Sequence, residues 1–90
     1  MKTIFDPEEA RRFAAFLDER ANELSSLNAN ASRALVELHA AHWQDKRFDQ
    51  FEKRFDEISV FVQRFSERAS HYAEYLRRKA VHIERYLDRA

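Results

Sequence analysis

Apolar residues recur at alternating steps of three and four along most of the chain, which is the period of one helix face. One run begins at Ala10 and a second at Phe48, and both keep the spacing of a heptad repeat. The pattern predicts an all-α, coiled-coil-like hairpin of two antiparallel helices, about 7–41 and 45–88, forming one domain over residues 1–90. It assigns to the seam between the helices Phe13, Leu17, Leu24, Leu27, Leu38, Phe48, Phe51, Phe55, Ile58, Val62, Phe65, Tyr72, Leu76 and Ile83.

Local signals mark where the helices begin and where the chain turns. Asp6 can cap free amides, and Pro7 suits the first position of a helix. Between the two runs the phase of the pattern resets, and Asp45 can cap the second helix there. The chain has no glycine, so ordinary residues must build the turn. Trp43 has a suitable size to fill the apolar gap at the tip.

Side-chain size and charge both favour antiparallel pairing of the helices. Folding the chain at the turn sets Ala34 beside Phe55 and Ala31 beside Ile58, so that small residues face large ones. Residues 1–45 carry five basic and eight acidic side chains, and residues 46–90 carry eleven and eight. The two halves of the chain therefore have opposite net charge. Although Ser25–Ser32 is rich in mediocre helix formers, the apolar phase continues through it, which predicts one continuous first helix.

Two helices share a single seam, so a hairpin this long cannot bury all of its apolar residues. Further apolar side chains and a stripe of small residues lie outside the predicted seam. We therefore predict that two hairpins form a four-helix bundle, as a homodimer or as a heterodimer. The predicted interface residues are Phe16, Ser25, Ala29, Ser32, Leu35, Val36, Val60, Phe61, Tyr75 and Val81.

Composition argues against most kinds of chemistry. The chain has no cysteine, and no serine or lysine stands visibly beside a general base, so we expect no enzyme, no cofactor and no catalytic residue. His39 and His42 lie near the turn with Asp45, but their spacing alone is a weak metal signal, and we predict no metal site. Sixteen basic and sixteen acidic side chains give a net charge of zero, which makes nucleic-acid binding an unfavoured alternative despite the basic C-terminal third.

Two long helices joined by a turn that contains Trp43, Gln44 and Asp45, followed by Phe48, Phe51 and Phe55, resemble a known family. These features are similar to the WxG family of small helical hairpins handled by type VII secretion systems, the early-secreted-antigen-like proteins. Asp45 stands where that family has glycine. The resemblance implies a homodimer or heterodimer of four helices that is exported or that escorts an effector or toxin. It also implies that Trp43, with Gln44 and Asp45, contributes to a docking surface.

Two further expectations concern location and the competing functions. No segment has the roughly 20 apolar residues of a membrane span, and the N-terminus lacks the apolar core of a cleaved signal. We expect the chain in the cytoplasm at synthesis, and the resemblance implies secretion without a cleaved signal peptide. The alternative function is a small bacterial regulatory or antitoxin-like partner protein.

Overall fold

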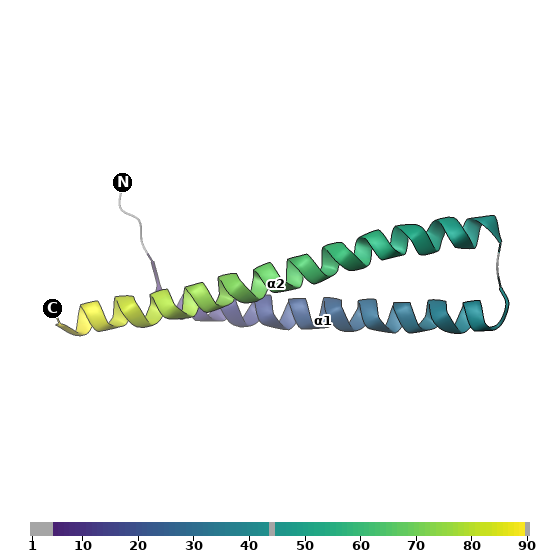
Figure 1. The fold of residues 1–90 in the computed structure, drawn as a ribbon. Coiled ribbons are helices and arrows are strands. Elements are labelled where there is room, and N and C mark those ends of the chain that lie inside the picture. Colours follow the sequence, from purple (N-terminus) through teal and green to yellow (C-terminus); the bar gives the residue numbers. More distant parts are fainter. Residues whose placement is uncertain (1–4, 44, 90) are drawn as a thin grey trace.

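The computed structural model describes residues 5–43 and 45–89, and they form an antiparallel hairpin of two long helices (Figure 1). Helix α1 spans Pro7–Ala40 and helix α2 spans Lys46–Arg89. The prediction of two packed helices is confirmed, and their bounds differ from the predicted ones by a single residue at three of the four ends. Helix α1 also runs unbroken through Ser25–Ser32, as the continuous phase of its apolar residues predicted.

Side-chain capping fixes the start of each helix. Asp6 accepts hydrogen bonds from the backbone amides of Glu8 (2.9 Å) and Glu9 (3.4 Å), with Pro7 at the first helical position. At the start of α2, the Asp45 carboxylate accepts a hydrogen bond from the Phe48 amide at 2.7 Å. Asp45 therefore has a structural role, because it satisfies an amide that has no acceptor within the helix.

The turn ends α1 in a Schellman arrangement. The amide of His42 donates a hydrogen bond to the carbonyl of His39 (3.0 Å), and the amide of Trp43 donates one to the carbonyl of Leu38 (3.2 Å). This geometry needs a left-handed residue, and His42 supplies it with a φ of 62°. Because the chain has no glycine, a residue with a side chain occupies the position where glycine is most common.

The seam between the helices is lined mainly by alanine, and this corrects the predicted seam. Many of the least exposed positions lie one residue away from the predicted ones. Each helix is therefore rotated about its own axis relative to the predicted packing. Leu17, Leu24, Phe48, Phe55, Val62, Leu76 and Ile83 are buried or partly buried, as a seam requires. The predicted seam residues that stay exposed are Phe13, Leu27, Leu38, Phe51, Ile58, Phe65 and Tyr72. The buried alanines in their place are Ala10, Ala14, Ala21, Ala69, Ala73 and Ala80.

The rotation has a packing cause. Ala14, Ala73 and Ala80 are fully buried, and side chains this small allow the two backbones to approach closely. Aromatic rings at those positions would hold the helices apart and lose the alanine contacts. The wrong step in the prediction was to assign the largest apolar side chains to the seam, since two helices can also pack through their small residues and leave the large ones outside.

The hairpin divides into two halves that pack differently. The open half, residues 7–24 and 67–89, contains the buried alanines and the ion pairs Arg11–Glu84 and Asp18–Arg77. In the turn half, residues 25–40 and 46–66, only Phe48 and Val62 are buried among the described side chains. In Figure 1 the start of α1 passes behind α2 near the chain ends, and the two helices lie one above the other toward the turn.

Candidate partner-binding face

One face of the hairpin is polar and joins the two helices through side-chain bonds. Arg11 donates a hydrogen bond to Glu84 at 3.0 Å within their ion pair, and Arg77 contacts Asp18 at 2.7 Å. The hydrogen bond from Arg11 lowers the pKa of Glu84 below its ordinary value. We call the side of the hairpin that carries these bonds the polar face.

The opposite face carries large apolar side chains. A step of two residues turns a helix by about 200°. Phe13 therefore lies across α1 from Arg11, and Tyr86 lies across α2 from Glu84, so both occupy the side away from the polar face. Residues at seven-residue spacing from these two continue the same row along each helix. This apolar face consists of Phe13, Leu27, Phe51, Ile58, Phe65, Tyr72 and Tyr86, each between 42% and 72% exposed.

Ring contacts widen the apolar face toward its two edges. Phe13 stacks on Phe16 at 6.3 Å between ring centroids, and Phe65 stacks on Phe61 at 6.4 Å. Tyr72 stacks on Tyr75 at 5.8 Å. Phe16, Phe61 and Tyr75 were each predicted at a partner interface, and the structure places all three at the edges of this face.

Two basic residues interrupt the apolar face, and each lies over an aromatic ring. The guanidinium of Arg20 lies 5.3 Å from the centre of the Phe16 ring and pairs with Glu23 at 3.2 Å. The ammonium of Lys79 lies 5.0 Å from the centre of the Phe5 ring and 5.8 Å from that of Tyr75. Because aliphatic stems can cover apolar surface while the charge reaches water, neither residue prevents another helix from packing here.

The structure places the other predicted interface residues away from the apolar face. Ser25 hydrogen-bonds to Ser66 at 3.0 Å, so this small residue serves the approach of α2 within the same chain. Leu35 is partly buried and continues the hairpin seam. The remaining predicted interface residues lie exposed on the polar face or the outer sides of the helices, namely Ala29, Ser32, Val36, Val60 and Val81.

The turn exposes its tryptophan. Trp43 is 58% exposed, so its ring does not fill a gap between the helices. The buried ring at this end is that of Phe48, whose centroid lies 6.1 Å from that of the His39 ring. Gln44, the middle residue of the predicted docking turn, lies outside the described residues. An exposed indole at the tip is available to contact another protein.

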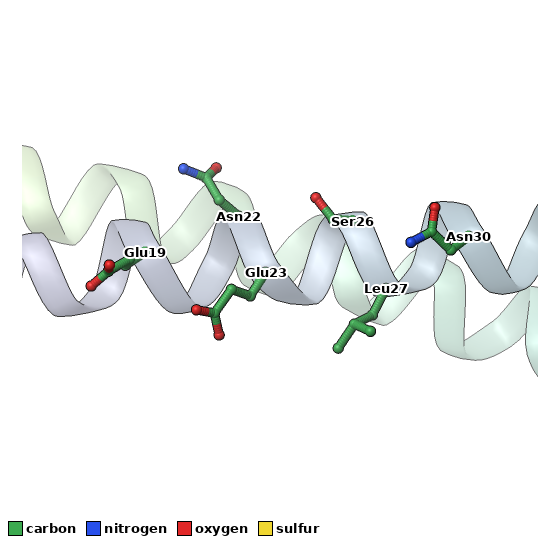
Figure 2. Close-up of a pocket in the computed structure, with 6 residues that line it drawn as sticks. All are labelled: Glu19, Asn22, Glu23, Ser26, Leu27 and Asn30. Atoms are coloured by element: carbon green, nitrogen blue, oxygen red, sulfur yellow. The ribbon is translucent and has the colours of Figure 1, made fainter.

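A hollow on α1 is shallow and open, because residues of that helix alone line it (Figure 2). Figure 2 shows its lining residues, Glu19, Asn22, Glu23, Ser26, Leu27 and Asn30, pointing to different sides of that helix. Among residues 5–43 and 45–89, no three histidine, aspartate or glutamate side chains gather as metal ligands.

Two further findings bear on function. Over the same described part of the chain, neither helix has a stretch long and apolar enough to cross a membrane. No family model matches the sequence, and no curated protein matches it.

Proposed function

We propose that the chain is a non-catalytic helical interaction protein whose apolar face binds a second helical hairpin, giving a four-helix bundle. The observation that carries the proposal is the apolar face itself. Seven large apolar side chains lie exposed in two parallel rows, on the side of the hairpin opposite its ion pairs. Contiguous apolar patches of this kind mark sites of protein association.

The surface area of the chain supports the same proposal. The accessible surface is 7857 Å², whereas a compact monomer of 10.8 kDa exposes about 5,500 Å². The radius of gyration is 20.0 Å, against about 12 Å for a compact domain of 90 residues. Among the side chains that the structure describes, no large one is fully buried in the isolated hairpin. A second hairpin on the apolar face supplies the core that two helices lack.

The biological role that we propose follows the resemblance to the WxG family. The bundle docks or escorts an effector protein, as the resemblance implies for type VII secretion substrates and adaptors. The exposed Trp43 at the tip supports a docking role for that end of the molecule. Asp45 does not prevent the turn from forming, because the left-handed position is His42 and Asp45 caps α2.

The experiment compares two substitutions of equal chemistry on opposite sides of α2. Ile58 lies on the apolar face at 55% exposure, and Val60 lies 50% exposed beside the Ser25–Ser66 contact. We expect light scattering to give twice 10.8 kDa for the wild-type chain and for Val60→Glu. Ile58→Glu should give a monomer or an unfolded chain, because it places a charge in the bundle core.

Other outcomes of this experiment are informative. A wild-type chain that is monomeric and poorly folded alone would show that the second hairpin is a different protein. The proposal would be contradicted by a wild-type monomer that keeps its helix content at every dilution and shows a cooperative transition when it is denatured. If Ile58→Glu and Val60→Glu both reduced the light-scattering mass from that of a dimer to that of a monomer, the apolar face would not be the interface.

A further inference from the structure

The two edges of the apolar face carry opposite charges. Along α1, an edge row at seven-residue spacing contains three glutamates, and the stretch of the α2 row that lies opposite contains two arginines and a histidine, with Arg47 and Arg89 beyond its two ends. The three glutamates and the three basic side chains opposite them are exposed. The α1 row is Glu9, Phe16, Glu23, Asn30 and Glu37. The opposite stretch of the α2 row is Arg54, Phe61, Arg68, Tyr75 and His82.

Two symmetric arrangements can stack one apolar face on another. If the two-fold axis runs along the helices, both turns lie at the same end and α1 packs on α2 of the second copy. If the axis is perpendicular to the helices, the turns lie at opposite ends and α1 packs on α1. The second arrangement sets the glutamate row against itself and the basic row against itself, so like charges meet along both edges.

The contacts within one hairpin fix which residues meet in the first arrangement. A two-fold rotation about an axis parallel to the helices does not change the position of a residue along that axis. Residues that are level within one hairpin are therefore also level between the two copies. The side-chain contacts between the helices are offset by up to four residues in either direction, from Asn28–Ser59 to Arg11–Glu84. The pairs Ser25–Ser66 and His39–Glu52 lie at the middle of that range, so we take the members of these two pairs as level. A step of two residues from these pairs sets Glu23 level with Arg68 and Glu37 level with Arg54. The same register sets Phe16 level with Tyr75 and Glu9 level with His82.

We propose that the occupant of the apolar face is a second copy of this chain, in the arrangement that puts both turns at one end. The inference rests on the proposed function and adds the identity and orientation of the partner. The charge rows select a second copy, because the acidic row of one chain lies level with the basic row of the other along both edges of the interface. Both Trp43 side chains then stand at the same end of the bundle.

The intrachain partners of the glutamates do not oppose this arrangement. Glu9 pairs with Arg12 at 2.9 Å and Glu23 with Arg20 at 3.2 Å, each within one turn of α1. Exposed pairs of this kind contribute little, and each glutamate has a second oxygen that can accept from another chain.

The first test uses the absence of cysteine from the natural chain. Glu23→Cys and Arg68→Cys are made as separate chains, and one sample of each is treated alone with a short bis-maleimide. Untreated samples of the two are mixed, allowed to exchange subunits under native conditions, and then treated with the same reagent. We expect a covalent dimer only in the mixture. Ala29→Cys and Val60→Cys are the matched control pair, because both residues are exposed away from the apolar face, and their mixture should not crosslink.

The outcomes separate this inference from the proposed function. A covalent dimer of Glu23→Cys with itself would mean that α1 packs on α1, which overturns the inference and leaves a dimeric bundle standing. A chain that is monomeric and poorly folded alone would also overturn it, because the partner would then be a different protein. A mixture that does not crosslink although light scattering gives a dimer would overturn the orientation.

A charge-reversal series provides the second measurement. Glu37→Arg should raise the dissociation constant of the dimer roughly tenfold, because the pair between Glu37 and Arg54 occurs twice in a two-fold symmetric dimer. Adding Arg54→Glu to the same chain should restore the affinity. If Glu37→Arg strengthens the dimer instead, the glutamate rows face each other and the inference is wrong.

Discussion

The open half and the turn half of the hairpin solve the same packing problem in different ways. In the open half, alanines bring the helices together and ion pairs join them across the polar face. In the turn half, polar pairs such as Ser25–Ser66 join the helices beside the buried Phe48 and Val62, and Phe51 and Ile58 remain more than half exposed. Large apolar side chains stay exposed in both halves, at Phe13, Tyr72 and Tyr86 in the open half and at Leu27, Phe51 and Ile58 in the turn half. The halves therefore differ in how α1 and α2 pack on each other, and both leave the apolar face uncovered.

The largest effect expected from this comparison is overpacking of the alanine seam. Ala73→Leu inserts three carbon atoms where the side chain is fully buried, and we expect it to lower the free energy of unfolding by about 1–3 kcal/mol. The matched control is Ala34→Leu in the turn half, where the alanine is exposed on the apolar side of α1. This control should leave the free energy of unfolding unchanged or raise it.

Urea denaturation followed by circular dichroism measures both changes. Equal destabilisation by the two substitutions would mean that the halves do not differ in packing, and the comparison would fail. A loss confined to Ala73→Leu would locate the close contact between the helices in the open half.

A smaller effect of opposite sign is expected at the turn. His42 adopts a positive φ, which costs a residue with a Cβ roughly 1 kcal/mol relative to glycine. His42→Gly should therefore raise the free energy of unfolding by up to about 1 kcal/mol. His42→Ala is the control, because alanine removes the imidazole and keeps the Cβ. A gain in both variants would trace the effect to the imidazole and not to the backbone.

The sequence predicted the helices well and their rotation poorly, for a physical reason. Heptad spacing and caps such as Asp6 determine helix bounds locally, so the bounds could be read from the chain. Leu24 and Val62 belong to the seam in either rotation. Phe13 and Ala14 compete for the seam at adjacent positions, and hydrophobicity alone favours the phenylalanine. Which of them faces α2 depends on the distance between the helices, and a one-dimensional pattern does not contain that distance.

The same limit applies to the candidate site. Phe61 and Tyr75 were assigned to a partner interface because they lie outside the predicted seam, whereas six of the seven residues of the apolar face, all except Tyr86, were assigned to the seam of the hairpin itself. The signal that could have found that face is the alternation of alanine with large side chains one residue away, as at Ala73 and Tyr72. The left-handed conformation of His42 carries no signal in its neighbours, because glycine is the usual marker of such a position.

The smallest effect concerns the ion pair that closes the open half, and it depends on pH. Arg11 lowers the pKa of Glu84 in the folded chain, so this carboxylate stabilises the fold above its ordinary pKa of about 4.3. That contribution is lost as the pH falls through the lowered folded pKa. Glu84→Gln should therefore destabilise the hairpin slightly at pH 7, and the difference from wild type should vanish in acid. Both side chains are partly exposed, so added salt should also reduce the difference.

The control for this prediction is Glu74→Gln, at an exposed site on the same helix. Urea midpoints measured for the wild type and the two variants between neutral and acidic pH separate the ion pair from a general effect of removing negative charge. If Glu84→Gln and Glu74→Gln shift the midpoint equally at every pH, the Arg11–Glu84 pair adds nothing to the open half. The alanine contacts alone would then account for the closer packing of that half.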